Sequence, residues 1–335
     1  MPNEKIVAVD IGGSKVRIQT VDRNGGLGPE NLAGLIGLNL DNKKFTQLLS
    51  ENIRLVMDAK TDADILAISI GSPGPLDTFK GVIETAPNLK GIKNLAIVAE
   101  LKDIFDWPVF LLNDADAAGL GEWWLGAGTG YNSVDYLTWS TGIGSSEIRN
   151  GRLQRGLGKA PEWGHTSIGI ENKWWLCGCG QWSCAEAYLG TNGLAKTYVR
   201  IFEVKESDLT EKDRHEISYK MREGIKAGDR KWLRVQEEYA KHSAVLLRNM
   251  ILVDQPQIIV IGGGIAYSNE PLLEEVKKQL KELMDPQKDK MAIMAEGVKI
   301  ALAQLENAVN IGAAKYAFDL IDLARKGEKE YGDMV

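Results

Sequence analysis

The stretch IVAVDIGGSKVRIQTVDRNG, at residues 6–25, indicates the plan of the fold. Two apolar, β-branched runs are joined by glycines and followed by an Asn-Gly pair, a pattern typical of a β-hairpin. Residues 134–151, VDYLTWSTGIGSSEIRNG, repeat this plan. Each hairpin is expected to have a tip rich in Gly, Ser or Thr and in exposed backbone amides. Coincidence is the alternative, but the repetition favours two similar domains that face one another across a cleft.

Apolar runs also end in glycine at residues 65–74 and 258–264. Such short runs indicate buried strands that lead into tight turns. Helix-like stretches lie between the runs, at 43–59, 93–105, 114–125, 231–253, 270–284 and 312–326. This alternation predicts an α/β fold with mostly parallel sheets. The highly charged stretch 203–230 predicts an exposed helical excursion.

Length and charge limit the classes of function. The 335 residues are enough for about two domains, each with its own core. With 40 Lys and Arg against 46 Asp and Glu, the net charge of −6 argues against nucleic acid or an anionic membrane as the main partner. The sequence contains no apolar run of about 18 residues, and its start lacks a signal-peptide pattern. We therefore expect a cytoplasmic protein.

All cysteines of the chain lie within eight residues, at Cys177, Cys179 and Cys184. His165 lies just upstream, and one imidazole with three thiolates is a complete tetrahedral zinc set with no position left for water. The segment 165–184 therefore predicts a structural zinc site, with a buried thiol cluster as the alternative. A metal there would draw the flanking carboxylates Glu162 and Glu186 together, an arrangement suited to hydrogen bonding with a polyol.

Two glycine loops suggest a site for a nucleoside triphosphate. The first hairpin tip contains Asp10, Gly12, Gly13, Ser14 and Lys15, where close backbone amides form an anion-binding concavity. Asp10 could hold a hydrated Mg²⁺ ion; a tight hairpin with a solvated Asp is the alternative. A second loop at 140–144 has the same composition. Neither loop has the GxxxxGK[ST] spacing of a P-loop.

Asn113 and Asp114 follow the apolar run VFLL at 109–112 and precede a helix-like segment. A carboxylate at this junction is well placed to face a cleft, although Asp114 could equally cap the helix. A kinase needs one carboxylate to accept the proton of the attacking hydroxyl. Asp114 is the candidate for that base.

These segments together resemble the ROK family of sugar kinases, within the actin-like and hexokinase-like (ribonuclease H-like) ATPase fold. The resemblance covers nearly the whole chain in the family's order of motifs. The motifs are DIGGSK at 10–15, PGPLD at 73–77, APNL at 86–89, NDADAAGLGE at 113–122, STGIG at 140–144, PEWGH at 161–165, CGCGQWSCAE at 177–186 and IVIGGG at 259–264.

The resemblance implies a role for each matching residue. Asp114 would be the catalytic base. The sugar-binding set would be Gly74, Asn88, Asn113, Asp114, Glu162, His165 and Glu186. ATP with Mg²⁺ would be bound by Asp10, Gly12, Gly13, Ser14, Lys15, Thr141, Gly142, Gly144, Gly262, Gly263 and Gly264. The zinc ligands would be His165, Cys177, Cys179 and Cys184, with His165 serving both the metal and the sugar.

The family fold implies a small domain formed by residues 1–112 plus 314–335 and a large domain formed by 113–313. It also implies a homodimer or homotetramer. The expected activity is ATP-dependent phosphorylation of a hexose, with glucose at its 6-hydroxyl as the first substrate. The alternatives are N-acetylmannosamine or another amino or N-acetyl hexose, and a non-catalytic sugar sensor. Repressors of this family carry an added DNA-binding domain, for which the charge is unfavourable.

The sequence departs from the family pattern after Gly144, in PEWGH at 161–165 and in SCAE at 183–186. Ser145, Ser146 and Glu147 follow Gly144, where the family has more glycines. A bulky Trp163 stands between Glu162 and the Gly164-His165 pair, where a small or aliphatic residue is more common. Tryptophans at 163, 174, 175 and 182 could form a sugar-stacking face, a core or a dimer contact, and His215 and His242 are expected on the surface.

Overall fold

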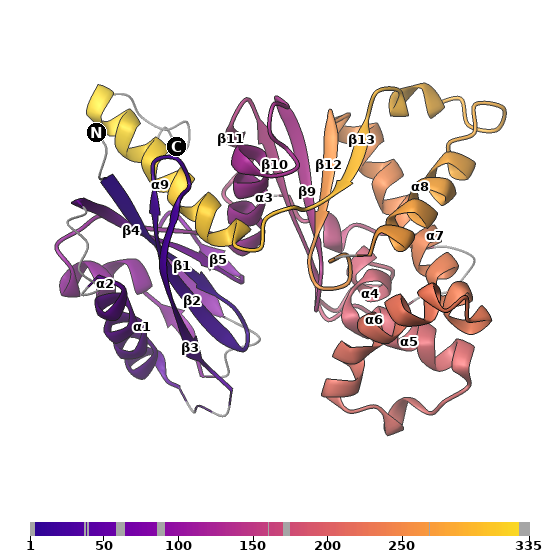
Figure 1. Cartoon of the computed structure of the whole chain (residues 1–335), viewed down its shortest axis with the longest axis horizontal. Coiled ribbons are helices and arrows are strands. Elements are labelled where there is room, and N and C mark those ends of the chain that lie inside the picture. The colour runs from indigo at the N-terminus through magenta and orange to yellow at the C-terminus, as the bar shows by residue number, and fades with distance from the viewer. Residues whose placement is uncertain are drawn as a thin grey trace. The chain divides into compact units, whose positions relative to one another are not determined.

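A computed structural model of the chain describes residues 4–36, 38, 40–57, 64–85, 91–159, 161–169, 175–267 and 269–327 (Figure 1). The chain forms two compact units. The first comprises Met1–Gly130, Gly151–Ala160 and Gln304–Val335, and the second comprises Tyr131–Asn150 and Pro161–Ala303. These units divide the chain at other positions than 112 and 314, because α3 (Asp114–Leu125) packs along α9 (Ala308–Lys326).

The first unit is built on a five-stranded sheet with the order β3-β2-β1-β4-β8. Its strands are β1 (Glu4–Ile11), β2 (Lys15–Asp22), β3 (Leu27–Gly34), β4 (Asp64–Ser72) and β8 (Val109–Asn113). The predicted hairpin is confirmed as antiparallel β1 and β2, and β1, β4 and β8 run parallel. The sheet is therefore mixed, and the expectation of mostly parallel sheets is wrong because each tight turn reverses the chain.

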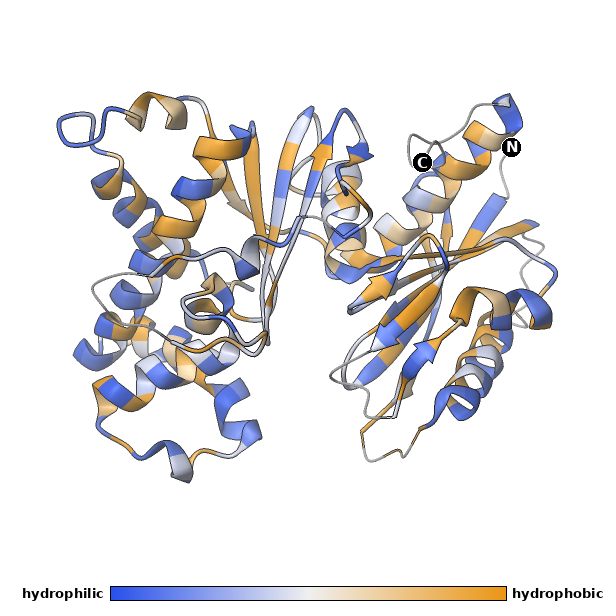
Figure 2. Cartoon of the chain, turned by 180° about the vertical axis from the view of Figure 1, so that it is seen from behind, coloured by the Kyte–Doolittle hydropathy of each residue, from blue (hydrophilic) through white to orange (hydrophobic). Residues whose placement is uncertain are grey.

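Alternation along β1 explains the layers on either side of this sheet. Val7 and Val9 pack in the cluster that includes α1 (Asn42–Met57) and α2 (Ile97–Ile104), whereas Ile6 and Ala8 pack with α9. Successive residues of a strand point to opposite faces, so both faces of a buried strand become apolar. Figure 2 shows these strands as hydrophobic and α1 as hydrophobic along one side. The unit thus has helices on both faces of its sheet (Figure 1).

The pair α3 and α9 is unusually close because small residues line the contact. A Cβ atom added to Gly312 would lie 1.7 Å from the carbonyl oxygen of Ala117, so only glycine fits there. The fully buried carboxylate of Glu122, on α3, accepts hydrogen bonds from the amides of Gln304 and Leu305, at 3.0 and 2.7 Å. This carboxylate ties the start of the C-terminal segment to α3.

The remaining elements of the first unit are short. A three-stranded antiparallel sheet consists of β5 (Leu76–Asp77), β6 (Val82–Thr85) and β7 (Lys93–Leu95). The helix-like stretch 93–105 is therefore corrected at its start, since residues 93–95 form a strand and the helix begins at Ile97. The segment 151–159 contains β11 (Arg152–Leu153).

The second unit has a sheet in which β9 (Ser133–Trp139) lies between β10 (Ile143–Arg149) and β12 (Ile258–Gly262), and β13 (Lys299–Leu302) follows β12. The second predicted hairpin is confirmed as antiparallel β9 and β10. The strand β12 runs parallel to β9. Both units therefore contain an antiparallel hairpin whose first strand has a parallel neighbour on its other side.

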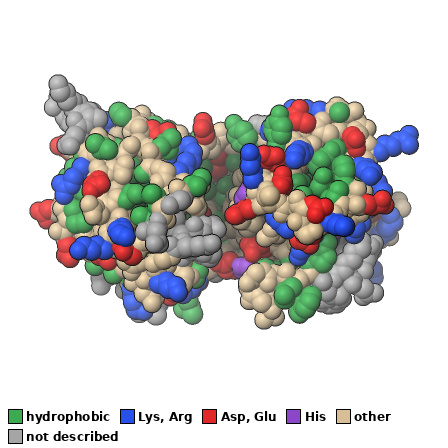
Figure 3. Space-filling view, turned by 90° about the horizontal axis from the view of Figure 1, so that it is seen from below, with side chains coloured by type: hydrophobic (Ala, Val, Ile, Leu, Met, Phe, Trp, Pro, Cys, Tyr) green, Lys and Arg blue, Asp and Glu red, His purple; other side chains and the backbone are tan. Residues whose placement is uncertain are grey.

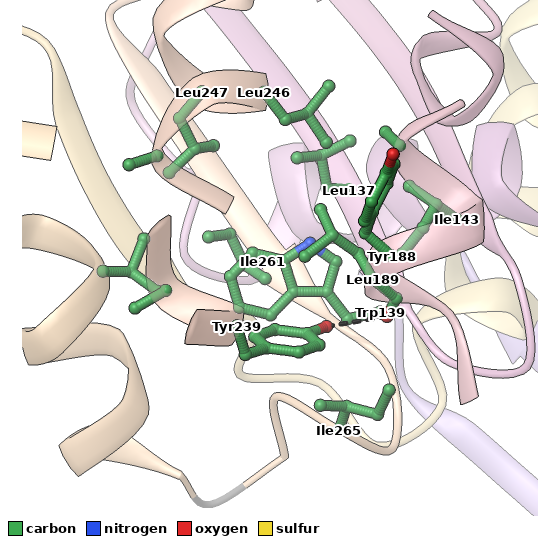
Figure 4. Packing of buried hydrophobic residues seen from close by; sticks show 14 of the residues in the cluster. Leu137, Trp139, Ile143, Tyr188, Leu189, Tyr239, Leu246, Leu247, Ile261 and Ile265 are labelled. Carbon is green, nitrogen blue, oxygen red and sulfur yellow. Dashed lines mark hydrogen bonds between the residues drawn. The ribbon is translucent and has the colours of Figure 1, made fainter. Parts of the chain in front are cut away.

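Helices cover one face of this sheet. They are α4 (Ala185–Leu189), α5 (Thr191–Phe202), α6 (Glu211–Lys226), α7 (Arg230–Asp254) and α8 (Glu270–Leu283), with short 3₁₀ turns η1 (Trp163–His165), η2 (Glu206–Asp208) and η3 (Ala292–Ala295). In the core, the ring of Tyr239 meets that of Trp139 edge to face at 5.6 Å (Figure 4). Its hydroxyl donates to the carbonyl of Leu189 at 2.8 Å, joining α7 to α4.

The charged stretch 203–230 forms η2 and α6, as predicted. Helix α6 buries Ile217, Met221 and Ile225 and exposes most of its charged side chains. Over the part of the chain that the structure describes, every helix is too short or too polar to cross a membrane. Lys and Arg side chains are interspersed with Asp and Glu on the face seen in Figure 3.

Candidate active site

The parallel strands of the first unit end at one edge of its sheet, and predicted site residues gather there. Asp10, near the end of β1, is paired opposite Gly71 of β4. Asn113 closes β8, and Asp114 begins α3. Gly74 follows β4, and a Cβ atom built on it would lie 3.7 Å from the Asn113 side-chain nitrogen. The fold therefore brings these four predicted residues together, as expected for the carboxyl ends of parallel strands.

Both carboxyl groups at this edge have raised pKa values. Burial raises the pKa of Asp10 to about 6, and the charge of Asp114 adds to the effect, while Arg17 and Lys15 oppose it. Burial also raises the pKa of Asp114, although the amide of Ala115 opposes that shift. A carboxylate whose pKa is moved toward neutrality is a better proton acceptor near pH 7. Neighbouring carboxylates also favour a cation, because it would stabilise both ionised forms.

Helix α3 has its own cap, which separates two interpretations of Asp114. The side-chain oxygen of Asn113, the N-cap residue, accepts a hydrogen bond from the amide of Ala115 at 2.8 Å. Asp114 Oδ1 also approaches this amide, at 2.9 Å. Because Asn113 caps the helix, capping does not require the Asp114 carboxylate, and this favours a chemical role for it.

The tip of the first hairpin is a tight turn that leaves its backbone accessible. The amide of Gly12 donates to the carbonyl of Lys15 at 2.9 Å and closes the turn. Gly13, Ser14 and Lys15 are exposed, whereas the neighbouring strand residues are buried. The carbonyl of Ser14 is held by the amide of Leu35 at 2.8 Å. This geometry fits the predicted phosphate loop, in which exposed amides and Lys15 would face an anion.

The second glycine loop, at 140–144, begins directly after β9 in the other unit. The amide of Ser140 donates to the carbonyl of Gly142 at 3.0 Å, and Thr141 is exposed at the tip. Gly144 lies in β10 opposite Thr138. The amide of Thr191, at the start of α5, donates to the Ser140 carbonyl at 3.0 Å and fixes the base of the loop.

The glycine turn at 262–264 lies next to this loop. Gly262 pairs with Thr138 in the parallel ladder between β12 and β9. Gly263 has a φ of +88°, and a Cβ atom on it would lie 2.3 Å from the carbonyl oxygen of Trp139, so glycine is required. Gly264 has open space around it. The two glycine segments predicted to bind a nucleotide thus meet at the end of β9.

The predicted metal ligands are clustered. The ligand atoms of His165, Cys177, Cys179 and Cys184 all lie within 4.8 Å of one another. His165 Nδ1 is 3.8 Å from Cys177 Sγ, and the sulfurs of Cys179 and Cys184 are 3.6 Å apart. Tetrahedral zinc with these ligand types places neighbouring ligand atoms about 3.6–3.8 Å apart. The donor set and spacing therefore fit zinc, with His165 presenting Nδ1 to the cluster.

The thiols also show why a cation would suit this cluster. Burial raises the pKa of Cys177 to about 12 and also raises the pKa of Cys184. Buried neutral thiols gain little here, whereas a divalent cation would stabilise the thiolates and release protons. The clustered donor set is compatible with zinc, and the structural zinc site stays a prediction beside the alternative of a thiol cluster.

Glu186 connects this cluster to the glycine loop. Its Oε2 accepts a hydrogen bond from the amide of Ile143 at 3.1 Å, and its Oε1 lies 3.6 Å from Cys177 Sγ. Glu186 is the second residue of α4 and lies two residues after the predicted ligand Cys184. The Glu186 carboxylate is therefore oriented both by the glycine loop, predicted to bind phosphate, and by the cysteine cluster, predicted to bind zinc.

Glu162 precedes the turn η1, and His165 is its last residue. The amide of His165 donates to the carbonyl of Glu162 at 3.0 Å, so the two residues are held at a fixed separation. Both side chains are exposed. Asn88 and the motif at 86–89 lie outside the described residues.

The tryptophans are not one aromatic face. Trp163 is buried, with 9% exposure, and Trp182 is 57% exposed. Trp175 is half-buried and stacks on Tyr188 at 4.9 Å. Trp174 lies outside the described residues.

The expectation that His242 is a surface residue is wrong. The residue is 5% exposed, and its ring stacks on that of Tyr188 with 4.6 Å between the ring centroids. Tyr188 lies in α4, which directly follows the predicted zinc segment. The Tyr188 hydroxyl donates to Ser183 Oγ at 3.3 Å, next to Cys184. Charged neighbours on α7 misled the interpretation, although the apolar spacing of that helix was a usable signal. His215 is exposed, as expected.

A buried acidic cluster was also missed. Asp135 is fully buried and forms an ion pair with Arg149 at 2.7 Å. Burial and the charges of Asp135 and Glu147 raise the pKa of Asp254 to about 7, and burial raises that of Asp135 to about 6. The three carboxyl groups lie close together, and the raised pKa of Asp254 indicates that this residue keeps a proton among them. The pairing of β9 with β10 sets Glu147 opposite Asp135, and the end of α7 adds Asp254.

Replacing Asp254 with Asn is expected to change how stability depends on pH. Folded wild-type protein keeps a proton on Asp254 up to about pH 7, whereas the unfolded chain releases it above about pH 4. The contribution of Asp254 to the free energy of unfolding therefore falls between about pH 4 and about pH 7 and is constant at higher pH. Asn keeps donors to its neighbours and cannot ionise. The measurement is urea unfolding of both proteins between about pH 4 and about pH 7. The free energy of unfolding of the variant, relative to that of the wild type, should rise by up to about 1.4 kcal/mol per pH unit.

Asp103→Asn, an exposed substitution on α2, is the matched control. Its free energy of unfolding should differ from that of the wild type by an amount that does not change over this pH range. A difference for Asp254→Asn that is constant with pH would show that this carboxyl group does not hold the proton.

Comparison with known proteins gives the following matches. The profile described as "ROK family" matches residues 6–319. A glucokinase from Halalkalibacterium halodurans is 27% identical over 93% of this chain and 94% of that protein. A xylose repressor from Caldicellulosiruptor bescii is 27% identical over 83% of this chain and 70% of that protein. The crystal structure of a ROK hexokinase from Thermus thermophilus has a TM-score of 0.80 and 28% identity, and covers 95% of this chain and 99% of that chain.

Proposed function

This chain belongs to the ROK family, and from that membership and the site geometry we propose that it is an ATP-dependent sugar kinase. Homology to a glucokinase over almost the full length supports a phosphotransferase. The proposed substrate is a hexose, with glucose and its 6-hydroxyl as the first choice. The observation that carries the proposal is the placement of Asp114 beside Asp10 at the strand ends, with the pKa of both groups raised toward neutrality.

In the proposed reaction, Asp114 accepts the proton of the attacking sugar hydroxyl as that oxygen bonds to the γ-phosphorus of ATP. The bond from that phosphorus to the bridging oxygen breaks, and ADP leaves. Asn113 and Gly74 border the same strand edge and would hold the reacting end of the sugar. Most of the rate enhancement in such transfers comes from positioning and electrostatics, so a single base suffices.

The second unit supplies the other contacts in this proposal. Glu162, His165 and Glu186 would accept and donate hydrogen bonds to the remaining sugar hydroxyls. His165 would use Nε2 for this, because Nδ1 faces the thiols. Zinc would be structural and would hold this segment in place.

The nucleotide contacts are divided between the glycine segments. The tip formed by Gly12 to Lys15 and the loop formed by Thr141, Gly142 and Gly144 would bind phosphates. The turn of Gly262, Gly263 and Gly264 would border the adenosine. Asp10 would help to hold Mg²⁺, which would neutralise charge on the transferring phosphoryl group.

The test is ADP release from MgATP with glucose, mannose, fructose, N-acetylglucosamine and N-acetylmannosamine. Phosphorus NMR of the product identifies the phosphorylated hydroxyl. Strong turnover on glucose supports the first choice, and turnover restricted to an N-acetyl hexose selects the alternative substrate class. Sugar binding without turnover on any sugar would contradict the kinase proposal and favour a sensor.

A further inference from the structure

The turn that carries Glu162 and His165 is attached to β10 at two points. The amide of Trp163 donates to Ser145 Oγ at 3.1 Å, and the Ser145 hydroxyl donates to the carbonyl of Pro161 at 3.1 Å. The indole Nε1 of Trp163 donates to Glu147 Oε1 at 3.0 Å. Residues 145 and 147 share one face of the strand, because side chains alternate along it. One face of β10 therefore holds both the backbone and the side chain of Trp163.

Trp163 is central to the turn. Its carbonyl accepts from the Thr166 hydroxyl at 2.8 Å and from the Thr166 amide at 3.2 Å. The residue before it is Glu162, and His165 follows two residues later with its amide on the Glu162 carbonyl. Any rotation of the Trp163 backbone would therefore move both side chains that are proposed to bind sugar.

The acceptor on β10 belongs to the buried acidic cluster. Glu147 is paired opposite Asp135 of β9 and lies near Asp254 at the end of α7. Arg149, on the same strand face, balances the Asp135 charge at 2.7 Å. The indole is 9% exposed, so its hydrogen bond to a carboxylate is shielded from water. Such charge-assisted, shielded bonds are stronger than exposed neutral ones.

We propose that Glu147 and Trp163 are positioning residues that set the placement of Glu162 and His165 and thereby the affinity for sugar. This inference rests on the proposed function, since it takes Glu162 and His165 as sugar contacts. It also joins two of the places where the sequence departs from the family pattern, because Trp163 contacts Ser145 and Glu147. Neither residue is proposed to touch the reacting atoms.

Trp163→Phe keeps an aromatic ring and removes the N–H donor. Loss of a hydrogen bond to a charged acceptor is expected to raise the sugar KM about tenfold or more. The kcat at saturating sugar and the KM for ATP should stay within about twofold, because the interaction is made equally in ground and transition states. Glu147→Gln keeps an acceptor oxygen without the charge and should raise the sugar KM less than Trp163→Phe does, whereas Glu147→Leu should match Trp163→Phe.

The double variant Trp163→Phe with Glu147→Leu should have no higher sugar KM than either single variant, because both changes remove one interaction. Trp107→Phe, at a half-buried tryptophan of the first unit that stacks on Phe105, is the matched control and should leave the sugar KM unchanged. Unchanged sugar KM in Trp163→Phe, or additive effects in the double variant, would overturn the inference.

Hydrogen exchange separates this inference from the proposed function. The amides of His165 and Thr166 should exchange faster in Trp163→Phe than in wild type, and Trp107→Phe should leave them unchanged. Unchanged exchange overturns the inference whatever the wild-type activity. Faster exchange in a chain that phosphorylates no sugar would support the positioning contact and place the failure in the proposed function.

Discussion

Replacing Asp114 with Asn is expected to lower kcat by about 10²- to 10⁴-fold, the usual contribution of a general base. The amide of Asn cannot accept the proton of the sugar hydroxyl. The sugar KM should change little if other residues provide most of the binding. The measurement is ADP release with MgATP and the preferred sugar, at saturating concentrations of both.

The fold should survive this change for a local reason. Asn113 caps α3 independently, and an Asn at 114 can still offer an oxygen to the Ala115 amide. The melting temperature should therefore stay within a few degrees of wild type, and it should be measured alongside. Asp106→Asn, an exposed substitution in the same unit, is the matched control.

The pH profile adds a second test of the base. The carboxylate must be ionised to accept a proton, so wild-type kcat should fall as pH decreases through the raised pKa of Asp114. A variant with near-wild-type turnover would remove Asp114 from the role of base. An inactive wild-type chain would instead count against the kinase proposal itself.

Replacing Cys184 with Ser is expected to release zinc and to lower the free energy of unfolding by several kcal/mol. A structural zinc ion contributes its binding energy directly to folding, and a serine hydroxyl is a poor ligand. Elemental analysis should give one zinc per wild-type chain and a large loss in the variant. Removal of the metal with a chelator should reproduce the loss of stability.

The loss should extend to sugar binding. His165 and Glu186 are held by the thiol cluster, so the sugar KM should rise at least about tenfold. The glycine loop should also respond, because Glu186 accepts from the amide of Ile143. The chain has no cysteine outside the cluster, so Gln181→Ala, at an exposed side chain of the same loop, is the control. Full zinc content in Cys184→Ser would contradict the ligand assignment.

Local patterns in the sequence were sufficient for the hairpins, for the strands that end in glycine and for the grouping of the cysteines. Each of these depends on residues that are close in the chain. The convergence of Asp10 and Asp114 was not predicted, although both were placed at strand ends and parallel strands end at the same edge of a sheet. The site at the end of β9 needed the pairing of Gly262 with Thr138, which sequence spacing alone does not indicate.

Other features depend on partners far apart in the chain, and these were not predicted. The buried carboxylate of Glu122 is satisfied by amides at 304 and 305, and nothing in the helix pattern signals them. Asp135, Glu147 and Asp254 become one cluster only through strand register and the end of α7. Helix α4 was missed because a five-residue helix followed by a glycine has little periodicity. Helix α5 was missed although its 12 residues have an apolar side at helical spacing.

The position of α9 has a consequence for synthesis on the ribosome. One face of the first sheet, with Ile6, Ala8 and Ala67, is covered by Ala314, Ala317 and Phe318 of that helix. Roughly 240 residues separate β4 from α9, so at 5–20 residues per second this covering helix emerges roughly 10–50 seconds later. During that interval the second unit can complete its own core. The nascent first unit meanwhile exposes an apolar sheet face, to which chaperones would bind.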